Sequence, residues 1–107
     1  MTRRVRLDAA HAAPVLSQMP PGPKRGMKDA LRGLAQDPTG RTVDLDVKEL
    51  DVGEALPRLY RLRVGAWRAV FAVGPREVTV ARIFHRLDGY GWMERLDEPR
   101  VRRADLD

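Results

Sequence analysis

The alternation of apolar and charged side chains is most regular near the middle of the chain. Tyr60, Leu62 and Val64 alternate there with Arg61 and Arg63. Successive side chains of a strand point to opposite faces, so this run predicts a strand with one apolar face and one basic face.

A tight turn follows this strand. Gly65 and Ala66 predict a two-residue hairpin loop, because glycine readily adopts the positive φ that such loops require. The hairpin would place Arg63 directly opposite Arg68, and like charges that face each other across two strands are destabilising. Three arginines on one face, with Arg61 as the third, therefore indicate a site that binds an anion.

Further strands flank the hairpin. Residues 67–73 continue it, a turn at Gly74-Pro75 follows, and residues 77–84 are rich in the β-branched side chains that strands favour. Basic and apolar residues alternate over residues 4–7, which predicts a short strand at a sheet edge. Alternation over residues 43–47 indicates extended chain whose pairing the pattern leaves open.

Two helices are expected between the first strand and residue 40. Apolar residues recur at helical spacing over residues 9–19, with Asp8 as the N-cap. Pro14 implies that this helix is kinked or starts later, since an interior proline costs about 3 kcal/mol. Pro23 fits the first turn of the second helix. The buried stripe of the second helix consists of Met27, Ala30, Leu31 and Leu34.

Together these elements predict an α+β fold. We expect an N-terminal strand and two helices packed on one face of a small antiparallel β-sheet that is mixed at one edge. Residues 1–96 would form the single domain, and residues 90–96 would end it with a short helix. Residues 97–107 carry charge without periodicity, so we expect a disordered tail.

Composition narrows the partner and the compartment. The 107 residues include 20 Lys and Arg against 15 Asp and Glu, a net charge of +5 that favours polyanions such as nucleic acid. There is no cysteine, and no apolar run approaches the roughly 20 residues of a membrane-spanning helix. We therefore expect a cytoplasmic protein without disulfides or membrane contact. One face of the second helix carries Arg25, Lys28 and Arg32, which we expect to bind nucleic acid.

The predicted strand over residues 77–84 is followed by side chains that could take part in catalysis or binding. His85 and Arg86 close it, and Tyr90 and Trp92 follow as candidates for stacking on a base. A two-residue turn before this strand would put His85 on the face of Arg68, whereas a three-residue turn would put Arg86 there. The pattern leaves the two alternatives open.

These motifs resemble the RelE/ParE superfamily of bacterial toxins from type II toxin–antitoxin pairs. The resemblance spans residues 5–96 and is densest in the run Tyr60-Arg61-Leu62-Arg63-Val64-Gly65-Ala66-Trp67-Arg68 and in His85-Arg86 with Tyr90. It implies a sheet with a concave basic face. In the RelE-like branch, which the motifs favour, this face cuts messenger RNA in the ribosomal decoding site. In the ParE-like branch a similar scaffold poisons DNA gyrase, and a cognate antitoxin neutralises both kinds.

The resemblance also implies roles for particular positions. The catalytic positions it implies are Arg61, Arg63, Arg68, His85 and Arg86. The aromatic that stacks on a messenger base would be Tyr90, although Trp92 lies nearer to the spacing in RelE. RelE has lysines where this chain has Arg61 and Arg63, and one of those lysines resembles a general base.

Metal-free RNA cleavage, in which the 2′-OH attacks the neighbouring phosphate, needs proton transfer and stabilisation of the phosphorane. Arginine suits the second task because its planar fork binds phosphate oxygens in pairs, but it stays protonated and is a poor base. An imidazole changes charge near neutral pH, so His85 is the best candidate for proton transfer, ahead of Glu49 and Glu54. The sequence has no phosphate-binding glycine loop, zinc spacing or acidic metal cluster, so no cofactor is expected.

We therefore predict a toxin that acts as a ribosome-dependent mRNA endonuclease, with the ribosome, messenger RNA and an antitoxin as partners. The basic cluster, the His-Arg pair and the tyrosine after it favour RNA cleavage. The alternatives are a ParE-type inhibitor of DNA gyrase and a weakly toxic module that mainly binds its antitoxin.

Overall fold

The computed structural model describes residues 2–40, 44–50 and 58–88. This part of the chain forms, in order, β1 (Arg4–Leu7), α1 (Ala13–Gln18), α2 (Pro21–Gln36), β2 (Asp46–Glu49), β3 (Leu59–Val64), β4 (Trp67–Val73) and β5 (Glu77–His85). A short 3-10 helix, η1 (Arg86–Asp88), follows β5. The short helix expected at residues 90–96 and the tail at 97–107 lie outside the described residues.

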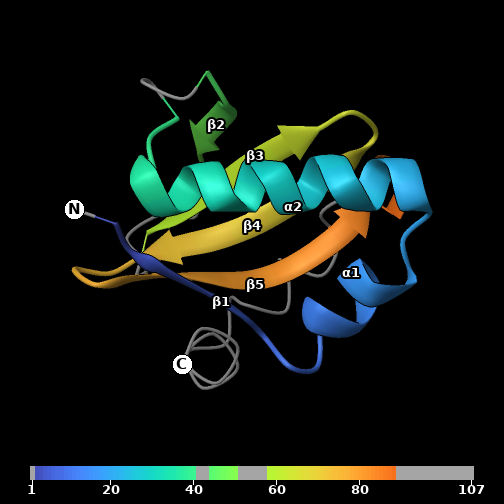
Figure 1. Ribbon diagram of the computed structural model, residues 1–107, viewed down its shortest axis with the longest axis horizontal. Helices are drawn as coiled ribbons and strands as arrows, with labels where there is room; N and C mark the ends of the chain where they lie inside the picture. The colour runs from blue at the N-terminus through green and yellow to red at the C-terminus, as the bar shows by residue number, and fades with distance from the viewer. Residues whose placement is uncertain (1, 41–43, 51–57, 89–107) are drawn as a thin grey trace.

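The strands form one mixed sheet in the order β1-β5-β4-β3-β2. Strands β2 to β5 pair antiparallel with their neighbours, and β1 lies parallel to β5 at one edge. Helix α2 crosses one face of the sheet, and α1 lies near the end of β5 (Figure 1). This arrangement confirms the predicted α+β fold, with both helices on one face and the first strand at an edge. No helix in the described ranges is long and apolar enough to cross a membrane.

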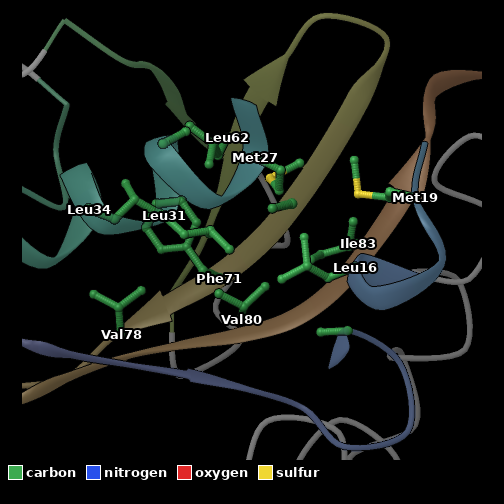
Figure 2. Close-up of a cluster of buried hydrophobic side chains, with 13 residues drawn as sticks. Leu16, Met19, Met27, Leu31, Leu34, Leu62, Phe71, Val78, Val80 and Ile83 are labelled. Atoms are coloured by element: carbon green, nitrogen blue, oxygen red, sulfur yellow. The ribbon is translucent and has the colours of Figure 1, made fainter. Parts of the chain in front are cut away.

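The core lies between the helices and the sheet (Figure 2). All four residues of the predicted stripe of α2 are buried, which confirms the periodicity of that helix. The sheet residues that complete this core include Leu62, Ala69, Phe71, Val78, Val80 and Ile83. The rings of Tyr60 and Phe71 stack with their centroids 5.6 Å apart, at the border between β3 and β4.

Prolines set where both helices begin. Helix α1 starts at Ala13, later than residue 9, because Pro14 can occupy a first turn but not a helix interior. The Asp8 carboxylate instead accepts hydrogen bonds from the backbone N–H groups of Ala10, at 3.1 Å, and His11, at 2.7 Å, and so holds the turn before α1. Helix α2 begins at Pro21, slightly earlier than expected, for the same reason.

The β3–β4 hairpin has the predicted register. Gly65 adopts a φ of +59°, and the two-residue loop pairs Val64 with Trp67 and Arg63 with Arg68. The alternation along β3 therefore puts Tyr60, Leu62 and Val64 on the helix side, and it puts Arg61 and Arg63, together with Leu59, on the other side.

The β4–β5 connection differs from both sequence alternatives. The N–H of Gly74 donates to the carbonyl of Glu77 at 2.8 Å, so Pro75 and Arg76 form the loop. Loop length alone does not fix the faces of β5, because a β-bulge interrupts its pairing with β4 between Val70 and Phe71.

The bulge reverses the faces of the second half of β5. Val70 pairs with Arg82 and Phe71 pairs with Val80, so Ala81 is the extra residue. A one-residue shift moves every later side chain to the opposite face. His85 consequently pairs with Trp67 on the helix side.

Candidate nucleic-acid interface

Three arginines project from the sheet face that lies opposite the helices. Arg61 and Arg63 come from β3 and Arg68 from β4, and we call the surface formed by these three residues the arginine face. Its assignment follows from strand parity, because the intervening Leu62 and Ala69 are fully buried in the helix-covered core. The predicted clustering of the three arginines is thus present.

The arginine face already contains an acidic partner. Asp46 of β2 pairs with Arg63 across the strands, and its carboxylate lies 3.9 Å from Arg63 Nε. The same carboxylate accepts a hydrogen bond from Arg61 Nη2 at 3.3 Å. The Arg61 side chain is only 15% exposed, whereas those of Arg63 and Asp46 are each more than half exposed. One carboxylate therefore offsets part of the repulsion between two arginines.

Arg68 is held differently from the other two arginines. Its Nη1 donates hydrogen bonds to the carbonyl of Gly65 at 2.8 Å and to that of Trp67 at 2.9 Å. These bonds turn its guanidinium toward the hairpin loop. Arg63 and Arg68 can therefore sit opposite each other with their charged ends directed to different partners.

Arg86 lies close to the same hairpin loop. Its backbone N–H donates to the carbonyl of Ala66 at 2.8 Å, which ties η1 to the β3–β4 turn. Its side chain is exposed. The backbone of Arg86 therefore lies beside the hairpin loop that Arg68 also contacts, and its role in the site stays a prediction.

His85 is the predicted site residue that the structure does not bring onto the arginine face. Its ring packs edge-on against Trp67 on the helix side, with centroids 5.2 Å apart and planes at 89°. Its Nδ1 accepts a hydrogen bond from the backbone N–H of Leu87 at 3.2 Å, which places the proton of the neutral ring on Nε2. The ring is half-buried at the end of the strand. Because it lies on the helix side, away from the arginine face, its role in proton transfer stays a prediction.

The basic residues predicted on the second helix form a patch on the helix side of the molecule. Arg25, Lys28 and Arg32 line a shallow hollow of about 270 Å³ together with Pro21 and Lys24. Arg32 also pairs with Asp29 of the same helix at 2.8 Å. These cations are exposed on the helix side. Arg32 also lines a larger open hollow of about 640 Å³ together with Asp46 and Arg63, so the patch approaches the arginine face at the β2 edge of the sheet.

Solved structures with a similar fold were found by comparison. RelE in the archaeal RelE–RelB complex from Pyrococcus horikoshii is similar at a TM-score of 0.66, with 25% identity over 80% of this chain and 97% of that one. The RelB–RelE antitoxin–toxin complex from Methanococcus jannaschii matches at 0.63, with 20% identity over 81% and 96% of the two chains. A mutant of the toxin RelE from E. coli in the free state matches at 0.60, with 15% identity over 83% and 88%. The chain is RelE-like.

This likeness rests on structure, since no protein-family model and no curated protein sequence matches the chain. Several of these similar structures are RelE toxins solved together with their RelB antitoxins. The structural likeness confirms the family resemblance that the central hairpin motif predicted.

Two polar residues of the RelE-like sheet were not singled out from the sequence. Arg82 lies in register with Val70 and so shares the side of the arginine face, and its Nη1 is 3.4 Å from His11 Nδ1. Asp46 is the second. Alternation along β5 could not predict the face of Arg82, because the bulge shifts the register. The position of Asp46 beside the arginines depends on the pairing of β2 with β3.

The remaining candidates for the RelE-like site divide in two groups. Glu49, a candidate base, pairs with Arg58 at 3.1 Å and is in register with Tyr60, so it belongs to the other side of the sheet. Tyr90, Trp92 and Glu54 lie outside the described residues. Within the described ranges no group of His, Cys, Asp and Glu could hold a metal ion.

Proposed function

We propose that this chain is the toxin of a toxin–antitoxin pair and that it cleaves messenger RNA on the ribosome. The observation that carries the proposal is the arginine face, which presents Arg61, Arg63 and Arg68 on a RelE-like sheet. Guanidinium groups bind phosphate oxygens in pairs, so this face suits an RNA backbone.

In this proposal the arginines stabilise charge rather than move protons. The 2′-OH of one nucleotide attacks the adjacent phosphate, the P–O bond to the 5′-oxygen breaks, and a 2′,3′-cyclic phosphate forms. Arg68 and Arg61 would hold the non-bridging oxygens of the phosphorane, and each such donor contributes about 10²–10³ in rate. Arg86, tied to the same hairpin loop, would add positive charge near the leaving group.

His85 is the proposed proton-transfer group. It is the last residue of β5, directly before Arg86. Its Nδ1 accepts the hydrogen bond from Leu87, and its Nε2 takes no part in that bond. Because the ring lies on the helix side, reaching the substrate would require the RNA to pass around the end of the sheet. This part of the proposal is the one that mutation tests most directly.

We further propose that the antitoxin covers the arginine face with an acidic segment. The similar RelE structures were solved with RelB, which supports a partner of this kind. Opposite charges steer association over distances of about 10 Å at moderate salt, so complex formation would be fast and sensitive to ionic strength.

The decisive experiment incubates the purified protein with programmed ribosomes and maps the 5′ ends of the messenger, beside a gyrase supercoiling assay. We expect cuts within the codon in the decoding site and no loss of supercoiling. Arg68→Ala should abolish the cuts, whereas Arg76→Ala, which removes an exposed arginine from the β4–β5 loop, should not. Intact messenger with inhibited gyrase would replace the proposal with a ParE-type activity. Intact messenger with active gyrase would leave only an antitoxin-binding module.

A further inference from the structure

The position of Asp46 has a consequence for how the arginine face binds an anion. Asp46 accepts a hydrogen bond from Arg61 and forms an ion pair with Arg63, at 3.3 and 3.9 Å. The guanidinium N–H groups used in these contacts are of the same kind as those that a phosphate would need. A nucleic acid that binds here therefore competes with a carboxylate that belongs to the protein.

The surroundings of Asp46 make this competition feasible. Strand β2 is the edge of the sheet, and the Asp46 side chain is 53% exposed. A half-exposed carboxylate at a sheet edge can turn into water with little desolvation penalty. Arg61, at 15% exposure, is the better-covered partner and stays in place beside β3.

We infer that Asp46 is an internal counterion that an RNA phosphate displaces from Arg61 and Arg63, and that it thereby weakens nucleic-acid binding to the arginine face. This inference rests on the proposed function, because it concerns the ligand of the same surface. It assigns Asp46 a role in setting affinity, by holding the arginines in a neutralised state until a polyanion of higher charge replaces the carboxylate.

Removing the charge of Asp46 should therefore strengthen binding. Asp46→Asn keeps the shape of the side chain but cannot neutralise a guanidinium. A single-stranded DNA oligonucleotide is a suitable probe, since it carries phosphates but no 2′-OH and cannot be cut by this chemistry. We expect its Kd to fall about threefold to tenfold, and the slope of log K against log salt to steepen by about 0.7 for each arginine newly available.

Glu49→Gln is the matched control. Glu49 lies on the same strand, pairs with Arg58 at 3.1 Å and belongs to the other side of the sheet. The substitution changes the net charge by the same amount as Asp46→Asn. It should leave both the Kd and the salt slope within about twofold of wild type, because distant surface charges are screened.

Each other outcome has a definite meaning. Binding by Asp46→Asn that equals that of wild type would overturn the inference. Equal strengthening in both variants would reduce the effect to net charge and would also overturn it. Weaker binding by Asp46→Asn, with both variants melting like wild type, would show that the carboxylate braces Arg61, which also overturns it. The cleavage assay separates the two proposals: a selective gain in binding by Asp46→Asn, without any messenger cleavage by wild type, supports the counterion role and refutes the proposed reaction.

Discussion

The two faces of the β3–β4 hairpin differ in what covers them and in what holds their side chains. On the helix side Leu62, Ala69 and Phe71 are fully buried, and packing fixes them. On the arginine face Arg61, Arg63 and Arg68 are fixed by one carboxylate and two backbone carbonyls. Adjacent residues of one strand are thus held in place either by packing in the core or by ion pairs and hydrogen bonds. Changes on the first face should affect unfolding, and changes on the second should affect binding and rate.

The largest expected effect is on the helix side. Phe71→Ala removes a fully buried ring that stacks on Tyr60, and it should lower the free energy of unfolding by about 3–5 kcal/mol. Urea denaturation followed by circular dichroism measures the change. A loss below about 1 kcal/mol would mean that the core can close around the missing ring, and the contrast between the faces would weaken.

The arginine face should show the opposite behaviour. Arg68→Ala is expected to reduce messenger cleavage on programmed ribosomes by about 10²–10³, because a donor to the phosphorane is lost. Its free energy of unfolding should change by no more than about 1 kcal/mol, since the side chain bonds only to the backbone carbonyls of Gly65 and Trp67. Arg68→Lys, which keeps the charge but loses the fork, should recover only part of the rate. Wild-type cleavage by a folded Arg68→Ala protein would remove Arg68 from the site.

His85 tests whether the helix side also takes part in the chemistry. If proton transfer by the imidazole is part of the reaction, His85→Gln should slow cleavage by about 10²-fold. Ribosome binding should be unchanged. Cleavage at the wild-type rate would limit His85 to its contacts with Trp67 and Leu87.

The smallest expected effect lies in the loop that joins the two faces. Gly65 has a φ of +59°, and no atom would contact an added Cβ, so Gly65→Ala should cost about 1–2 kcal/mol through backbone strain alone. Gly26→Ala in α2, where an added Cβ would meet only Val64 Cγ1 at an ordinary 3.5 Å, should instead raise the thermal midpoint slightly, because alanine favours the helix. Equal changes in stability at the two glycines would show that the positive φ of Gly65 carries no measurable strain for alanine, for example because the hairpin shifts its register.

Local rules account for the parts that were predicted from sequence. The register of Arg63 with Arg68 depends only on alternation within β3 and on the loop at Gly65, so it was confirmed. The late start of α1 follows from Pro14 in the same way. These features involve residues within a few positions of each other.

Features that depend on distant pairing could not be derived. The bulge at Val70 leaves Ala81 unmatched and places His85 beside Trp67, and no residue of the β4–β5 loop signals it. The ion pairs of Asp46 require β2 to dock on β3 in one register, which the alternation near residue 46 left open. The sequence therefore predicted the clustering of the arginines but not the carboxylate that partly neutralises them.

The parallel pairing of β1 with β5 determines when the sheet of this protein can be completed during synthesis. Arg4 is in register with Glu77 and Leu7 with Val80, so the first strand to leave the ribosome must wait for the last strand of the sheet. The β3–β4 hairpin can form early from neighbours, but closing β1 onto the sheet spans nearly the entire described sequence, and contacts of long sequence separation form slowly. A nascent chain thus gains its finished sheet only after most of its own message has been translated.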